Sequence, residues 1–118
     1  MILKPIFFET AKATIKEISF PTLDEVAETL KTNPQLLIIE IQGHADERGN
    51  DDYNLLLTED RAASVKEYLV GKGVSADRLS SHGYGETRPL CKQHNPSCWS
   101  QNRRVEFVIL RRTDHPLP

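Results

Sequence analysis

Long apolar runs are missing from this chain of 118 residues, and aromatic residues, methionine and cysteine are scarce. The longest uninterrupted apolar stretches, such as Leu36–Ile39 and Phe107–Leu110, fall far short of the 18 or so residues that a membrane-spanning helix needs. The N-terminus also lacks the apolar segment of a secretory signal. These absences exclude a transmembrane helix, and they leave either a cytosolic protein or one domain of a larger protein.

Catalytic and nucleic-acid-binding patterns are absent as well. The chain has no G-x-S-x-G elbow and no H-E-x-x-H motif, so we expect neither a serine hydrolase nor a zinc peptidase. Its 15 basic residues are outnumbered by 17 acidic ones, and the basic pair Arg103-Arg104 has no interleaved aromatic residues. We therefore expect a non-enzymatic domain with no cofactor, no metal and no nucleic-acid partner.

Length and composition indicate a single small domain. One hydrophobic core usually occupies about 100–150 residues, and the apolar share of 38% suffices for one core. We expect one domain over residues 1–118, with its core at about residues 5–112 and a frayed tail at Thr113–Pro118.

The hydrophobic periodicity predicts two helices. Ser19 precedes Phe20-Pro21 as an N-cap, and apolar residues then recur at helical spacing as far as Asn33-Pro34. The second helix is expected to begin after an N-cap at Thr58 and to end near Gly71. Strands are expected at Ile6–Glu9, Leu36–Ile41, Arg78–Tyr84 and Val105–Leu110.

The resulting order β-α-β-α-β-β predicts the α/β fold class, an α+β two-layer sandwich with a mixed four-stranded sheet. No helix separates the last two strands, so the sheet cannot be wholly parallel. Two long connections are expected, a polar loop at Gly43–Asn54 and a loop at Gly85–Gln101.

Charges of opposite sign are segregated along the chain. The segment Glu40–Asp60 holds seven acidic residues and one arginine, whereas Arg88–Arg112 holds six basic residues and one glutamate. The simplest interpretation is that the two segments lie side by side and neutralise each other. The alternative is a ligand that carries both signs of charge.

Arg61 is the unusual residue of the expected second helix. A cation in the first turn opposes the helix dipole by about 0.3–1 kcal/mol. An ion pair with a nearby acid such as Asp46, or simple solvation, would offset this cost. A third interpretation is that Arg61 and free N–H groups bind a carboxylate while Asp46 holds an ammonium group, which would make a receptor for a zwitterion.

Cys91 and Cys98 lie in one expected loop, together with His94 and Pro96. We expect a disulfide between the two cysteines, which would fit an oxidising compartment such as the periplasm. Free thiols and a zinc site are the alternatives, although zinc would find only three ligands here where a structural site has four.

Several motifs in order carry a family resemblance: GHADERG (Gly43–Gly49), YN (Tyr53-Asn54), L-T-x-x-R-A (Leu57–Ala62), GKGVSADRL (Gly71–Leu79), GYGETRP (Gly83–Pro89) and NRRVEF (Asn102–Phe107). Together they closely resemble the OmpA-like peptidoglycan-binding domain over about residues 5–112. The GHADERG run is characteristic of the peptidoglycan-associated lipoproteins within that family.

The resemblance implies non-covalent binding of the cell-wall stem peptide through meso-diaminopimelate. It places Asp46 on the ammonium and Arg61 on the carboxylate of that residue, with Asn54 lining or bracing the pocket. Backbone groups around Thr10, His44 and Ala45 would be neighbours. The implied role is tethering of the outer membrane or a membrane protein to the wall, in the periplasm, through a segment outside this chain.

Other features give smaller expectations. A second function, compatible with the same fold, is a periplasmic scaffold for a Tol-system partner. One arginine of Arg103-Arg104 is expected to pair with acids near Gly43–Asp60, and His44 to brace its loop. Trp99 is expected to anchor its loop against the sheet, or to stack on a sugar. Ala11 departs from relatives that carry a polar residue there.

Overall fold

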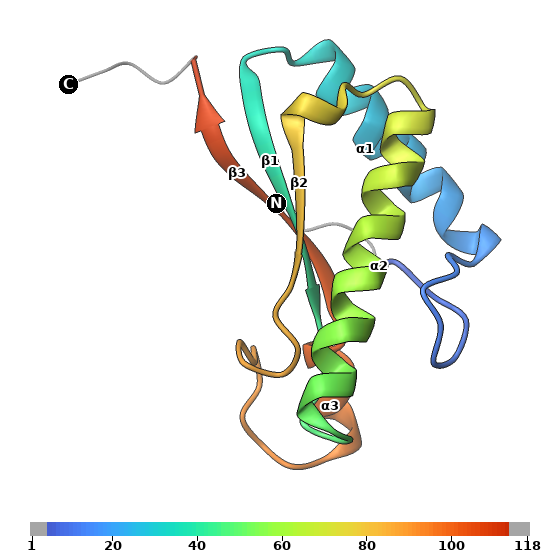
Figure 1. Cartoon of the computed structure of the whole chain (residues 1–118), viewed down its shortest axis with the longest axis vertical. Coiled ribbons are helices and arrows are strands. Elements are labelled where there is room, and N and C mark those ends of the chain that lie inside the picture. Colours follow the sequence, from blue (N-terminus) through green and yellow to red (C-terminus); the bar gives the residue numbers. More distant parts are fainter. Residues whose placement is uncertain (1–4, 114–118) are drawn as a thin grey trace.

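A three-stranded sheet organises the part of the chain that the computed structural model describes, residues 5–113 (Figure 1). The strand order is β2-β1-β3, with β1 parallel to β2 and antiparallel to β3. Helices α1 and α2 cover one face of the sheet (Figure 1). The fold is therefore the expected two-layer α/β arrangement. The elements are β1 (Leu36–His44), β2 (Leu79–Gly83), β3 (Arg104–Arg112), α1 (Phe20–Thr32), α2 (Asp51–Gly71) and α3 (Pro96–Asn102), with 3-10 turns η1 (Glu17–Ser19) and η2 (Ala76–Arg78).

The expected fourth strand at Ile6–Glu9 does not join the sheet, so the prediction of four strands was wrong for the described residues. This segment folds back on itself, with one bridge between Phe8 and Ile15. Its backbone donors are used locally, because the N–H of Glu9 bonds to the carbonyl of Thr14 and the N–H of Phe7 bonds to the hydroxyl of Ser19. The predicted tail lies outside the described residues beyond Thr113.

Helix α1 follows its prediction closely. It begins after Ser19 with Pro21 in its first turn, and it ends at Thr32, with Asn33 as its C-cap. The side chain of Ser19 does not cap the helix, since its oxygen accepts from Phe7 instead. The predicted apolar stripe is buried against the sheet and α2, and it consists of Leu23, Val26, Ala27 and Leu30.

Helix α2 begins two turns earlier than predicted. Asn50 is its N-cap, and the Asn50 side-chain oxygen accepts hydrogen bonds from the N–H groups of Asp52 and Tyr53. Thr58, the expected cap, is buried in the interior of the helix, where its hydroxyl donates to the carbonyl of Leu55. Arg61 consequently lies in the third turn, so the argument from an unfavourable helix dipole no longer applies to it.

Two glycines let α2 lie directly on the ends of β1 and β2. A Cβ added at Gly43 would come within 2.3 Å of the carbonyl oxygen of Thr58, and one at Gly83 within 2.2 Å of the backbone nitrogen of Glu59. Real side chains do not tolerate such distances, so both positions require glycine. This backbone-to-backbone contact fixes the helix beside the loop that follows β1.

A third helix interrupts the expected loop at Gly85–Gln101. Helix α3 starts with Pro96 in its first turn, and the side chain of Asn95 accepts from the N–H of Cys98 as its N-cap. Cys91 and Cys98 form the predicted disulfide, which joins α3 to the segment before it. Among the residues described, none of the helices has the length and apolar character to cross a membrane.

Candidate binding site

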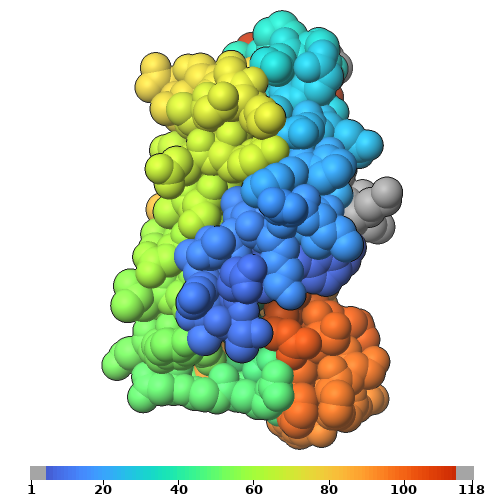
Figure 2. Space-filling view, turned by 90° about the vertical axis from the view of Figure 1, so that its right-hand side faces the viewer, coloured from blue at the N-terminus to red at the C-terminus, as the bar shows by residue number. Residues whose placement is uncertain are grey.

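A cavity of about 260 Å³ opens where the loop after β1 meets α2. Figure 2 shows the same region from outside, where the N-terminal segment, the start of α2 and the α3 region come together on one face. Three guanidinium groups and one carboxylate line the cavity. The lining residues are Ala45, Asp46, Arg48, Gly49, Tyr53, Asn54, Leu57, Thr58, Arg61 and Arg103.

Asp46 is the single acid of the cavity, and it is only 6% exposed. Its Oδ1 accepts from the backbone N–H of Arg48 at 2.8 Å and from Arg48 Nε at 3.2 Å. Its Oδ2 accepts from Arg48 Nη2 at 2.9 Å and from Arg103 Nη1 at 2.8 Å. Burial alone would raise the pKa of Asp46, but the hydrogen bonds from the two arginines outweigh it and lower the pKa to about 2. Asp46 is therefore a fixed negative charge.

Asn54 braces the loop that carries Asp46. Its side-chain nitrogen donates to the carbonyl of Arg48 at 2.8 Å and, more weakly, to the carbonyl of Asp46 at 3.5 Å. Gly49 adopts a positive φ of 93°, which turns the chain back toward Asn54. The buried amide thus holds both ends of the Asp46–Arg48 turn against α2.

Arg61 faces the cavity from α2 without an acidic partner among the described residues. Its Nε donates to the carbonyl of Lys12 at 2.9 Å, its Nη2 to the carbonyl of Glu9 at 3.4 Å, and its guanidinium lies 4.9 Å from the ring centroid of Phe8. Burial lowers the pKa of Arg61, Tyr53 acts in the opposite sense, and the charge of Arg103 lowers it further. A partly buried cation held by carbonyls and an aromatic ring is suited to receive an anion.

Helix α3 ends beside the cavity, which Arg103 lines. Arg103 follows its last residue and pairs with Asp46, as expected for one arginine of that pair. Trp99 donates from its indole N–H to Glu47, and the guanidinium of Arg48 lies 4.4 Å from its ring centroid. Trp99 therefore anchors α3 to the Asp46 loop, where the sequence had suggested an anchor against the sheet.

Two of the predicted neighbours, Thr10 and His44, do not line the cavity. Thr10 lies in the N-terminal segment, between the two carbonyls that hold Arg61. His44 is buried among polar side chains, with Nε2 at 3.0 Å from Gln42 Oε1 and its ring stacked on Tyr84. Burial, together with the charge of Arg104, lowers the pKa of His44 to about 4. Ala45, Asp46, Asn54 and Arg61 are the predicted site residues that the fold brings together.

Sequence reasoning missed Arg48 as a cavity residue. The signal was available in the GHADERG run, because a residue two positions after an aspartate in a tight turn returns toward its carboxylate. Tyr53 was placed in a loop, whereas it lies in the first turn of α2 at the cavity rim. No group of three or more histidine, cysteine, aspartate or glutamate side chains within residues 5–113 is arranged to hold a metal ion.

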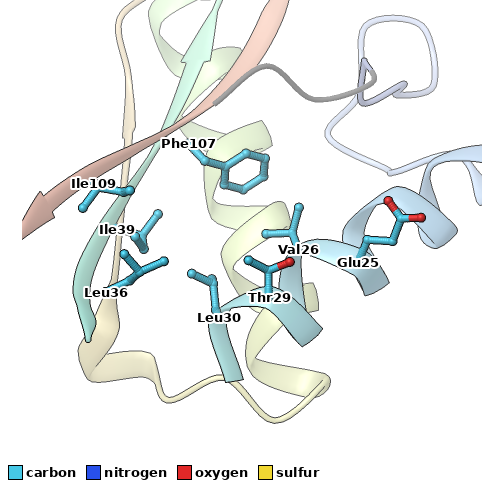
Figure 3. Close-up of a pocket in the computed structure, with 8 residues that line it drawn as sticks. All are labelled: Glu25, Val26, Thr29, Leu30, Leu36, Ile39, Phe107 and Ile109. Atoms are coloured by element: carbon cyan, nitrogen blue, oxygen red, sulfur yellow. The ribbon is translucent and has the colours of Figure 1, made fainter. Parts of the chain in front are cut away.

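A second cavity, of about 90 Å³, lies at the other end of the sheet, between α1 and the strands. Figure 3 shows apolar side chains of α1 facing those of β1 and β3 across it. Glu25 and Thr29 are its polar members, and the others are Val26, Leu30, Leu36, Ile39, Phe107 and Ile109.

The fold and the first cavity define a small α/β module with a pocket lined by charges of both signs. Residues 7–103 match the OmpA family, and the chain belongs to that family. It is 44% identical over 104 residues to a peptidoglycan-associated lipoprotein of Mesorhizobium japonicum, a match that covers 88% of this chain and 61% of the relative. The chain thus spans about three fifths of the length of that protein.

Solved structures with the same fold include the peptidoglycan-associated lipoprotein of Burkholderia pseudomallei, with 33% identity, 89% of each chain covered and a TM-score of 0.79. The cell wall anchor of the type VI secretion system of Pseudomonas aeruginosa is 26% identical, with 89% of this chain and 75% of that chain covered and a TM-score of 0.78. These proteins are named for association with peptidoglycan and for anchoring, and none for a catalysed reaction. The prediction of a non-enzymatic domain agrees with them.

Proposed function

We propose that this domain binds peptidoglycan non-covalently through the meso-diaminopimelate of the stem peptide. The observation that carries the proposal is the pairing, within one cavity, of a fixed negative charge at Asp46 with a guanidinium at Arg61 that lacks an acidic partner among the described residues. The D-centre of diaminopimelate carries one ammonium and one carboxylate. Asp46 would hold the ammonium, and Arg61 would hold the carboxylate in a charge-assisted hydrogen bond.

The cellular role that follows is tethering of an outer membrane, or of a membrane protein, to the cell wall in the periplasm. The names of the relatives support this role, and the Cys91–Cys98 disulfide supports an oxidising compartment. The dissociation constant for a ligand in one small cavity is on the order of micromolar to millimolar. Firm attachment would then come from many copies acting on one wall.

A titration of the ¹⁵N-labelled domain by NMR tests the proposal. The ligand is a muropeptide containing diaminopimelate, and the matched control ligand contains lysine, which lacks the second carboxylate. We expect shifts around Asp46, Asn54 and Arg61 with the first ligand only. An absence of shifts at millimolar diaminopimelate ligand would contradict wall binding.

A matched pair of variants assigns the two charges. In Arg61→Gln the preference for diaminopimelate over lysine should disappear, because the second carboxylate loses its partner. Lys66→Gln removes a positive charge one turn and a half further along α2 and lies outside the cavity lining, so it should keep the preference. Equal preference in both variants would contradict the role of Arg61.

A second function, docking of a Tol-system partner, would use a surface outside the cavity. The observation that favours it is a pair of exposed apolar side chains near the start of α2, with Leu55 48% and Leu56 62% exposed. Asp46→Ala should abolish binding to purified cell-wall sacculi and preserve binding to the partner. Leu55→Ser/Leu56→Ser should have the opposite effect, and loss of both activities in either variant would contradict two separate surfaces.

A further inference from the structure

The cavity holds more positive charge than the D-centre of diaminopimelate can match. Its lining includes Arg48, Arg61 and Arg103 against the single acid Asp46. An ammonium and a carboxylate together add no net charge. A ligand that contributed only these two groups would leave the excess of positive charge in the cavity unchanged.

The carboxylate of Asp46 has no free position for an incoming ammonium. A carboxylate offers about four acceptor sites, and four donors already occupy Asp46: the backbone N–H, Nε and Nη2 of Arg48, and Nη1 of Arg103. An ammonium can bind there only if a donor leaves. Ligand binding at Asp46 is therefore an exchange of one cation for another.

The side chain of Arg48 is the donor best placed to leave. It is 55% exposed, compared with 44% for Arg103, so it returns to water at a lower cost. Its backbone N–H stays on Asp46, because Asn54 holds the carbonyl of the same residue. Contact with the ring of Trp99 keeps the displaced guanidinium at the rim of the cavity.

The guanidinium of Arg103, next to that of Arg48, has hydrogen-bond donors that no described residue uses. Of its three guanidinium nitrogens, only Nη1 forms a hydrogen bond with the described residues, which leaves Nε and Nη2 for a ligand. Once Arg48 is released from Asp46, its guanidinium and the two unused nitrogens of Arg103 are available to the same anion.

We propose that the cavity binds a second carboxylate of the stem peptide at Arg48 and Arg103, as the ligand ammonium replaces the Arg48 side chain on Asp46. This inference rests on the proposed function and deepens it. The stem peptide offers two sources of such a group, the carboxylate at the L-centre of a terminal diaminopimelate and the α-carboxylate of the neighbouring D-glutamate. Both present the same chemistry to the two arginines.

Calorimetric titration with three synthetic tripeptides, L-Ala-γ-D-Glu-diaminopimelate and its two singly amidated forms, tests the proposal and separates the sources. In the wild-type domain, amidation of the carboxylate that binds should weaken affinity about tenfold, the effect of one charge-assisted hydrogen bond. In Arg48→Gln the same amidation should change affinity less than about twofold.

Lys31→Gln is the matched control, because Lys31 lies near Gly73 at the far end of α2 and its removal changes net charge equally. It should keep the full effect of amidation. Equal affinity of the wild type for all three peptides would overturn the proposal, and so would an undiminished effect in Arg48→Gln. A lysine-containing peptide, titrated in parallel, tests the proposed function separately from this inference. The preference for diaminopimelate over lysine depends on Arg61, so it should persist in Arg48→Gln.

Discussion

The two cavities at opposite ends of β1 differ in whether the side chains that line them have partners for their polar and charged groups. The cavity near Leu36 is lined mostly by aliphatic and aromatic side chains that need no partner. The cavity beyond His44 is lined by charges, and one of them, Arg61, has no acid among the described residues. The comparison teaches that an unmet charge is a better sign of a ligand than an enclosed apolar space. Changes to one cavity should therefore affect stability, and changes to the other should affect binding.

Leu30→Ala should have the largest effect on stability. An effect of this variant on binding would contradict the separation of the two cavities. Leu30 is 3% exposed and lines the apolar cavity, so its truncation enlarges the cavity. We expect a loss of about 3 kcal/mol in the free energy of unfolding, measured by urea denaturation. Affinity for the diaminopimelate muropeptide should stay within twofold at a temperature where the variant is folded, and a larger change would show that the two ends are coupled.

Acid should destabilise the polar end in two separate steps. Burial keeps His44 neutral, so between pH 6.5 and about 4 the unfolded chain binds a proton that the folded chain does not. As the pH is lowered through this range, the free energy of unfolding should therefore decrease by about 3 kcal/mol. Asp46 is kept ionised, so a further loss of about 2 kcal/mol follows between pH 3.8 and about 2. Urea denaturation across this range measures both steps.

His44→Gln is the control for the first step. Glutamine keeps a polar side chain that does not titrate, so the loss between pH 6.5 and 4 should largely vanish. The loss below pH 3.8 should remain, because it belongs to Asp46. A variant with an unchanged pH profile would contradict the assignment to His44.

Cys91→Ser/Cys98→Ser should affect stability and binding together, since the disulfide joins α3 to its preceding segment and Arg103 follows α3 directly. Removing a cross-link over so short a loop costs about 2 kcal/mol. Affinity should fall several-fold, because Arg103 helps to hold Asp46 in place. The denaturation midpoint and a muropeptide titration on the same sample measure the two effects, and unchanged affinity would contradict a role of α3 in the cavity.

Thr29→Val should have the smallest effect on stability, and it tests whether the polar group in the apolar cavity contributes to binding. Thr29 is a polar residue of the apolar cavity, and valine has nearly the same shape. We expect a change of at most about 1 kcal/mol in stability and no change in affinity. A measurable loss of binding would contradict the separation of the two cavities.

The sequence predicted best where burial imposes a regular pattern. Helix α1 and the strand beginning at Leu36 were found because their apolar residues repeat at the spacing of the packed face. The start of α2 was missed because Asp51–Tyr53, Leu55 and Leu56 are exposed and show no apolar stripe. The only local signal there was the cap formed by Asn50 and the two acids after it. Helix α3 was missed for the same reason, since it has seven residues and only Cys98 and Asn102 are buried.

The site was predicted in part because its motifs are local. Asp46, Asn54 and Arg61 lie within 16 positions of each other, and a family resemblance located all three. The occupation of Asp46 by Arg48 depends on the turn at Gly49 and on the brace from Asn54. Such side-chain geometry follows from the folded loop and cannot be derived from residue spacing alone.

The contacts of Arg61 have a mechanical consequence. The guanidinium that faces the cavity also holds the carbonyls of Glu9 and Lys12, which belong to the segment leading to the N-terminal end. A movement of this segment away from α2 would therefore break both hydrogen bonds. It would free Nε and Nη2 of Arg61 to donate to a bound carboxylate, so the position of the segment sets how many donors Arg61 offers a ligand.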